Sequence, residues 1–220
     1  MGDKNKFDYG GDSAQVHWDG KLCIHYGECG RAQGHLFVNG RTPWCQPDLS
    51  GADEIREVVL RCPTGALTAT FEDGSTIKPD LENNTATISQ NGPIYLKGRL
   101  EFDDETSDRE ALTAGTRYRA ALCRCGASGN KPFCDNSHET TGFNDSGAVG
   151  KTGPGFESDS EVLQVKSVPD GPVMVTGKLT ILASTGRVAW QGEKAFLCRC
   201  GASENKPFCD GSHKKIGFEA

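Results

Sequence analysis

Short runs of aliphatic and β-branched residues recur through the C-terminal two thirds of the chain, and polar or glycine-containing turns separate them. Runs of this length and composition are typical of strands rather than helices. We therefore expect strands at Ile94–Phe102, Tyr118–Leu122, Val173–Val175, Leu179–Leu182, Arg187–Gln191 and Ala195–Leu197.

A helical pattern occurs closer to the N-terminus. Ser50 and Asp53 resemble a capping box, and the Cys62-Pro63 step should end the helix. The run Leu67–Phe71 then predicts a strand. One face of the predicted helix carries residues at i, i+3, i+4 and i+7, namely Ile55, Val58, Val59 and Cys62.

Two segments of the C-terminal half are near copies of each other. Residues 123–143 and 198–218 are identical at 16 of 21 positions, at an offset of 75 residues. A weaker similarity relates residues 92–98 to residues 171–177 at an offset of 79. The first copy therefore has four additional residues, and the acidic stretch Glu101–Glu110 is the natural place for them, as a solvated loop.

The repeat suggests how the chain is divided. Residues 144–154 are rich in Gly with Ser and Thr, and they predict a linker between the copies. We expect three units, at residues 1–80, 81–148 and 149–220. Each of the last two should be a small β-rich unit closed by a cysteine loop, with a short helix such as Cys209–Lys215 at its end.

Composition explains why such units would need metal. Hydrophobic residues make up 35% of the chain, so a single large apolar core is not expected. The first residues are polar, and no run approaches the ~18 apolar residues of a membrane span. We expect a cytoplasmic protein whose ten cysteines are reduced and available to metal. A net charge of −6 without a basic block argues against nucleic-acid binding.

Each near copy contains the spacing Cys-x-Cys-x8-Cys-x3-His. Three thiolates and one imidazole could hold a [2Fe–2S] cluster, and the imidazole would raise its potential and make it acid-labile. A structural zinc site is the alternative, although zinc pairs normally have two to four residues between their cysteines. The predicted ligands are Cys123, Cys125, Cys134 and His138 in the first copy, and Cys198, Cys200, Cys209 and His213 in the second.

The string Cys-Asp-Gly-Ser-His at 209–213 resembles the motif of the CDGSH iron–sulfur (mitoNEET-like) family. The first copy departs from the named motif only at Asn136, a residue that tolerates the left-handed conformation of the family's Gly. The resemblance implies one [2Fe–2S] cluster per motif, with the first two cysteines on the inner iron and the last Cys and the His on the outer iron. It also implies two β-rich units paired about a two-fold axis, here within one chain.

Other charged residues recur with the ligands. Arg124 and Arg199, with Lys131 and Lys206, could offset cluster charge or steer a partner, or could be solvated loop charges. We expect Asp135 and Asp210 to support the loop beside the outer iron, by capping or by contact with a ligand.

The N-terminal cysteines suggest a third centre. Cys23, Cys29 and the Cys62-Pro63 step resemble the ligands of divergent single-cluster ferredoxins, with Tyr26 where the middle cysteine would stand. The resemblance implies a ferredoxin-like α+β domain at residues 1–80, so we expect the chain as a whole to be an α+β protein. Three cysteines suit a [3Fe–4S] cluster, or a [4Fe–4S] cluster with a non-cysteine ligand; a structural zinc site or no metal is the alternative. Cys45 is a possible further ligand or a buried thiol, and His25 is expected to be structural.

These features predict a function without organic catalysis. No nucleophile–base pair, phosphate loop or substrate pocket signature is present in the sequence, so we do not expect an enzyme. Electron transfer with a redox partner is the first hypothesis, and storage or delivery of clusters to an acceptor protein is the second. A zinc-stabilised interaction module is the third. We expect a monomer with an internal pseudo-dimer and no membrane association.

Overall fold

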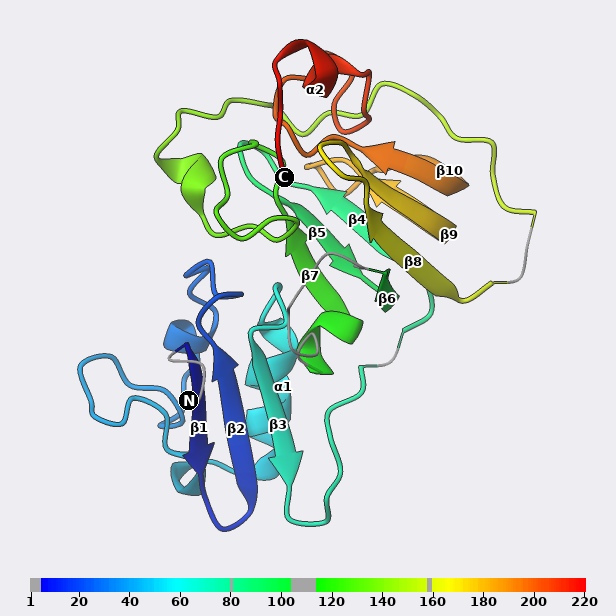
Figure 1. The fold of residues 1–220 in the computed structure, drawn as a ribbon. Coiled ribbons are helices and arrows are strands. Elements are labelled where there is room, and N and C mark those ends of the chain that lie inside the picture. Colours follow the sequence, from blue (N-terminus) through cyan, green and yellow to red (C-terminus); the bar gives the residue numbers. More distant parts are fainter. Residues whose placement is uncertain (1–4, 80, 104–113, 158–159) are drawn as a thin grey trace.

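The fold combines two β-sheets with a few short helices (Figure 1). This computed structural model describes residues 5–79, 81–103, 114–157 and 160–220. The α+β class expected from the sequence is confirmed. Within the described ranges, every helix is too short or too polar to cross a membrane.

The N-terminal unit is a three-stranded antiparallel sheet with one α-helix packed behind it (Figure 1). The sheet order is β1-β2-β3, so the central strand pairs with both neighbours. The elements are β1 (Lys6–Gly10), β2 (Ala14–Asp19), the 3-10 turns η1 (Cys29–Arg31) and η2 (Pro47–Leu49), α1 (Ala52–Arg61) and β3 (Leu67–Phe71).

The predicted helix face is confirmed, and the predicted cap is wrong. The side chains of Ile55, Val58 and Val59 on α1 are at most 1% exposed and pack into the N-terminal core. Gly51 is the N-cap residue and no side chain caps the helix, so Ser50 lies outside it. Asp53 in the first turn instead stabilises the N-terminus through the helix dipole.

The second sheet has seven strands in the order β6-β8-β9-β4-β5-β7, with β10 paired to β9. Figure 1 shows it in green to orange above the N-terminal unit. Its strands are β4 (Thr85–Ile88), β5 (Ile94–Lys97), β6 (Arg99–Asp103), β7 (Arg119–Leu122), β8 (Val162–Ser167), β9 (Val173–Leu182) and β10 (Val188–Leu197). The 3-10 turns η3 (Ala114–Arg117) and η4 (Ser137–Glu139) and the helix α2 (Ser212–Lys215) complete the fold.

The strands of the second copy are longer than the sequence pattern predicts. Two predicted strands merge into the ten-residue β9, which runs through Gly177 at φ +117°. Two others merge into β10, whose register shifts twice against β9. In the first copy the predicted strand is interrupted at Gly98, the equivalent glycine, at φ +159°. Sequence pattern therefore identified these segments but not their continuity, and it did not predict β1, β2, β4 or β8.

Two parallel strand pairings connect the copies. Thr85 of β4 lies opposite Thr180 of β9, and Glu101 of β6 lies opposite Gln164 of β8. At the repeat offset of 79 residues, position 85 of the first copy is equivalent to position 164 of the second, and position 101 is equivalent to position 180. The pair 85–180 is therefore equivalent to the pair 164–101, with the two copies exchanged. Each copy thus pairs one strand with the other copy in the same register.

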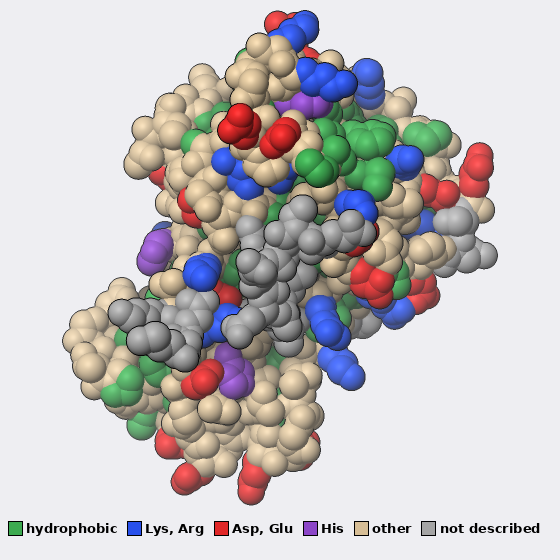
Figure 2. All heavy atoms as spheres, in the orientation of Figure 1, with side chains coloured by type: hydrophobic (Ala, Val, Ile, Leu, Met, Phe, Trp, Pro, Cys, Tyr) green, Lys and Arg blue, Asp and Glu red, His purple; other side chains and the backbone are tan. Residues whose placement is uncertain are grey.

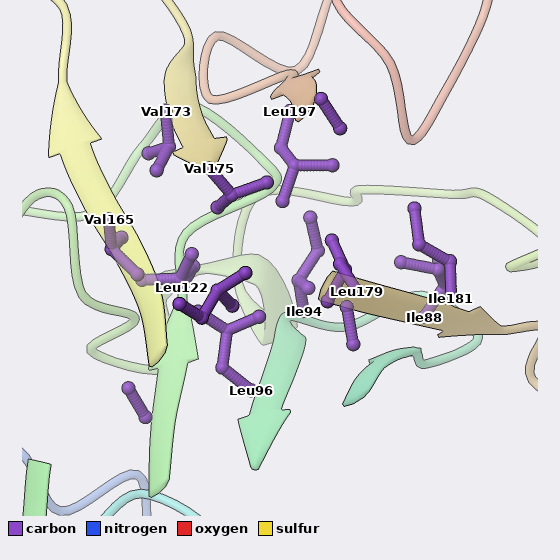
Figure 3. Packing of buried hydrophobic residues seen from close by; sticks show 14 of the residues in the cluster. Ile88, Ile94, Leu96, Leu122, Val165, Val173, Val175, Leu179, Ile181 and Leu197 are labelled. Carbon is purple, nitrogen blue, oxygen red and sulfur yellow. The ribbon is translucent and has the colours of Figure 1, made fainter. Parts of the chain in front are cut away.

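One apolar core fills the space between these strands (Figure 3). This differs from the expectation that composition would not support a large core, because the copies contribute to a shared interior. Its members come from both repeats, together with Leu22 and Ala66 of the N-terminal unit, and they are buried. Among them are Ile88, Ile94, Leu96, Leu122, Val165, Val173, Val175, Leu179, Ile181 and Leu197.

The two predicted connections have different outcomes. Residues 144–154 contain no helix or strand, as expected of a linker, yet Val149 is only 5% exposed and joins the core. The acidic stretch begins as strand rather than loop, since Glu101 and Asp103 belong to β6. Asp103 forms an ion pair with Lys166 of β8 at 2.8 Å. Residues 104–110 lie outside the described residues.

Two glycines show how closely the cysteine loops approach each other. A Cβ on Gly126 would overlap the carbonyl oxygen of Cys200, and a Cβ on Gly201 would overlap that of Cys125. Neither carbonyl can move freely, because each belongs to a loop backbone.

We predict that Gly201→Ala lowers the free energy of unfolding by about 2 kcal/mol more than Gly186→Ala, measured by urea denaturation. Gly186 is the matched control because it shares the φ of +80° but has open space around its Cα. The cost of a left-handed alanine cancels between the two variants. Equal destabilisation would contradict a tight contact between the loops.

Candidate metal centres

The first repeated loop brings its four predicted ligands together in two pairs. Cys123 follows directly on β7, and its Sγ lies 3.8 Å from Sγ of Cys125. Sγ of Cys134 lies 3.4 Å from Nδ1 of His138 on η4. The two pairs lie near each other because the backbone N–H of Cys123 donates to the Pro132 carbonyl oxygen and that of Cys134 donates to the Ala121 carbonyl oxygen, both at 2.8 Å.

The second loop repeats this arrangement. Sγ of Cys198, which follows β10, lies 3.7 Å from Sγ of Cys200. Sγ of Cys209 lies 3.3 Å from Nδ1 of His213 on α2. All eight residues predicted for the two repeated sites are therefore placed in like pairs.

The distances suit two metal positions in each loop. Two thiolates at about 2.3 Å from one tetrahedral metal lie about 3.8 Å apart, and a thiolate and an imidazole lie slightly closer. Across the described part of the chain, however, no three Cys, His, Asp or Glu side chains converge on one metal position. Each loop therefore presents its donors as two separate pairs rather than as one set around a single metal position.

Buried cysteine thiolates need a positive charge nearby to be stable. The pKa of Cys134 is raised to about 11 because burial disfavours its thiolate. The pKa of Cys123 is raised by its hydrogen bond with Cys125, and the same contact lowers the pKa of Cys125 to about 6. Burial also raises the pKa of Cys198. Bound metal would supply the charge that makes these thiolates stable.

Backbone conformation fixes the last ligand pair of each loop. Asn136 and Gly211, just after the third cysteine, adopt left-handed conformations at φ +75° and +87°. The replacement of Gly by Asn in the first copy is therefore tolerated, as predicted. The backbone N–H groups of both residues also point to the preceding thiol sulfurs, at 3.4 Å.

The aspartates that follow the third cysteine cap the loop. The Asp135 carboxylate accepts hydrogen bonds from the backbone N–H groups of Gly129 and Ser137, at 2.8 and 3.0 Å. Although burial raises the pKa of Asp135, hydrogen bonds from Ser137 lower it overall. Asp210 accepts the equivalent bonds from Glu204 and Ser212. Of the two predicted roles, capping is the one found.

The repeated arginines are not solvated loop charges. Arg124 is 1% exposed and donates to the carbonyl oxygens of Gly92 and Ser89, and it forms an ion pair with Asp145. Arg199, 3% exposed, donates in the same way to Gly171, Val168 and Ala220. Buried guanidinium groups persist only when paired or hydrogen-bonded. Each arginine therefore fastens its cysteine loop to the strand-connecting turn beside it.

The repeated lysines have a partly local role. Lys131 Nζ donates to the Ser128 carbonyl oxygen at 2.7 Å, and Lys206 Nζ donates to that of Ser203 at 2.5 Å. Lys131 also lies 5.6 Å from the ring centroid of Phe218 in the other copy. These contacts favour loop stabilisation over free surface charge.

The N-terminal cysteines line one cavity of about 580 Å³. Cys23, Cys29 and Cys62 all contribute to its wall. The pKa of Cys29 is raised by burial and by the nearby thiols of the other two cysteines. Three mutually repelling thiolates around one cavity suit a metal cluster, which would neutralise them.

Three further residues were considered for this centre. Cys45 is 1% exposed within the apolar core and does not line the cavity, and burial raises its pKa to about 12. This placement fits the buried-thiol interpretation. His25 does line the cavity, beside Tyr26, which stands at the missing ligand position and is 52% exposed.

The contact between the N-terminal loop and the first repeated site was not foreseen. Ile24 packs with Ala121 and Cys134 in a small buried cluster, against Tyr95. Asn130 donates to the Lys21 carbonyl oxygen at 2.7 Å. The sequence offered one signal, an apolar residue inside a cysteine loop, but nothing in it identified the surface that this residue covers.

We predict that Cys62→Ser removes the N-terminal cluster, whereas Cys45→Ala keeps it. Iron content and visible absorption of the anaerobically purified proteins would test this. Cys45→Ala should instead cost about 1–2 kcal/mol of unfolding free energy, because it leaves a small cavity in the core. Loss of iron from the Cys45 variant without loss of stability would make Cys45 a ligand.

Comparison with known proteins agrees with this arrangement. A family model described as an iron-binding zinc finger of CDGSH type matches residues 91–139 and 170–214. A model described as a divergent 4Fe-4S mono-cluster matches residues 9–72. The chain is also 37% identical over 59 residues to the uncharacterized protein YjdI of Escherichia coli K12, which covers 27% of this chain and 78% of that protein. Its counterpart in Escherichia coli O157:H7 gives the same values.

Proposed function

Since this chain belongs to the CDGSH iron-binding family and begins with a divergent 4Fe-4S mono-cluster domain, we propose that it is an electron-transfer protein with three clusters. Two would be [2Fe–2S] clusters in the repeated loops. The third would be a [3Fe–4S] or [4Fe–4S] cluster in the N-terminal cavity. When bound, such clusters accept and return single electrons without a change in protein bonding.

The observation that carries the proposal is the paired placement of donors. Each repeated loop presents a thiol–thiol pair and a thiol–imidazole pair at single-metal distances, for example Cys123 with Cys125 and Cys134 with His138. A zinc site would need four donors around one position. The arrangement therefore favours [2Fe–2S] over zinc in both loops.

The proposal includes an internal pseudo-two-fold pairing of the CDGSH units within a monomer. It is supported by the reciprocal register of β4 with β9 and of β6 with β8. The equivalent approaches of Gly126 and Gly201 to the opposite loop also support it. A cytoplasmic location is part of the proposal, since all ten cysteines are free, as expected in a reducing compartment.

Cluster content is the first test. The anaerobically purified protein should contain about seven irons and about eight sulfides per chain for two [2Fe–2S] and one [3Fe–4S] cluster, with one more iron for [4Fe–4S]. Electron paramagnetic resonance of both oxidation states would identify each type. A colourless zinc protein would contradict the proposal, and about four irons with four sulfides would leave the N-terminal cavity without a cluster.

Cluster delivery is the second candidate function, favoured by the exposure of one histidine. His213 is partly exposed, whereas His138 is only 9% exposed. An imidazole that can be protonated leaves a metal more readily than a thiolate does. The second site could therefore release its cluster to an acceptor.

We predict that His213→Cys slows cluster transfer to an apo-ferredoxin by at least about tenfold, while reversible reduction persists at a lower potential. His138→Cys is the matched control and should slow transfer less, because its site is covered. Transfer would be followed by visible absorption of the acceptor. Unchanged transfer in the His213 variant would argue against delivery through this ligand.

A further inference from the structure

The two repeated sites are alike in their ligands but differ in what covers them. On the first copy, Tyr95 of β5 lies opposite Ala121 of β7, whose carbonyl oxygen accepts a hydrogen bond from Cys134 N–H at 2.8 Å. On the second copy, Met174 of β9 lies opposite Phe196 of β10. The Phe196 carbonyl oxygen accepts the equivalent bond from Cys209 at 2.7 Å. These two surfaces can be compared position by position.

The surface of the first copy is covered by the N-terminal cysteine loop. Ile24 packs against Ala121 and Cys134, and the ring of Tyr26 meets Tyr95 edge-on at 5.9 Å between centroids. Cys134 in this cluster is 3% exposed, and its partner His138 is 9% exposed. The cavity that holds the N-terminal cysteines therefore adjoins the first repeated site.

The surface of the second copy is open and more apolar. Phe196, which stands where the first copy has Ala121, is 42% exposed. Cys209 and His213 beside it are partly exposed. A large aromatic side chain in solvent beside a candidate redox centre is typical of a contact point in a protein interface.

Charge distinguishes the two copies as well. Residues 198–218 contain four basic and two acidic residues, whereas residues 123–143 contain two of each. The difference lies mainly in α2, where Lys214 and Lys215 are exposed and stand at the positions of Glu139 and Thr140. Figure 2 shows Lys and Arg side chains around a histidine, with Asp and Glu side chains close by, at the end of the molecule where α2 lies in Figure 1. With four basic and two acidic residues, residues 198–218 have a formal charge of +2 in a chain whose net charge is −6.

From these differences, and resting on the proposed electron-transfer function, we propose that the repeated sites have unequal roles. The first is an internal site coupled to the N-terminal centre through the covering loop. The second is the exit, and its open surface of Met174, Phe196 and the α2 lysines docks an acidic redox protein. The partner would place apolar side chains on Phe196, as Ile24 does on Ala121, and carboxylates near Lys214 and Lys215.

A binding titration tests the surface without requiring electron transfer. The probe is a small acidic [2Fe–2S] ferredoxin, added to the holoprotein at low ionic strength and followed by calorimetry. Phe196→Ala and Lys214→Glu, each of which installs the residue of the first copy, should weaken binding by about fivefold to tenfold. Added salt should weaken wild-type binding and reduce the difference between wild type and Lys214→Glu.

Lys78→Glu is the matched control, because it makes the same charge change at an exposed position in the N-terminal unit. It should change binding less than about twofold, since its charge is distant and screened. Equal weakening by Lys78→Glu would overturn the proposal, as would absence of wild-type binding or preference for a basic probe such as cytochrome c. Self-association that Phe196→Ala abolishes would assign the surface to a second copy and also overturn it.

Reduction of the clusters is measured separately by voltammetry. A protein that binds the probe as expected, but whose clusters take up no electrons, would contradict the proposed electron-transfer function and support the docking surface. A protein whose clusters are reduced reversibly, but which does not bind the probe, would support the proposed function and contradict the docking surface.

Discussion

The pairing of strands between the two repeats is the interaction on which the rest of the C-terminal fold depends. Neither repeat has a core of its own, because β4 needs β9 and β8 needs β6 to complete the sheet. Burial of shared apolar surface is then the main stabilising force for both. The same pairing brings the two cysteine loops into contact. Gly126 lies against the Cys200 carbonyl oxygen and Gly201 against that of Cys125, so closely that a Cβ at either position would overlap it.

Electrostatics sets the second requirement. Burial raises the pKa of Cys134, and the hydrogen bond with Cys125 raises the pKa of Cys123, so bound metal would supply the charge that stabilises these two thiolates. Arg124 adds positive charge near the sulfurs, since it interacts electrostatically with Cys125 and Cys198, while the guanidinium groups of both repeated arginines donate to backbone carbonyl oxygens. These hydrogen bonds fix each cysteine loop to the neighbouring turn. Asp135 and Asp210 add hydrogen bonds within the loops, where they accept from the backbone N–H groups of Gly129 and Glu204.

The sequence predicted the local chemistry well and the long-range arrangement less well. Ligand pairs such as Cys209 and His213 were predicted from their spacing of four residues, although Cys209 lies outside α2 and the left-handed Gly211 makes the turn between them. The helix face of Ile55, Val58 and Val59 was predicted for the same reason. The exchange of strands between repeats and the contact of Ile24 with Cys134 join residues far apart in the chain. No local period encodes such contacts, and none encodes the burial of Arg124 against Gly92 and Ser89.

Fusion of two similar cluster loops in one chain has a consequence for how such proteins can diverge. In a symmetric homodimer every substitution occurs twice, so both sites must accept it. Here a change at position 196 leaves position 121 as it was, and the two positions already hold Phe and Ala. Selection can thus bury one cluster loop and expose the other within the same chain. Two identical subunits could not differ in this way.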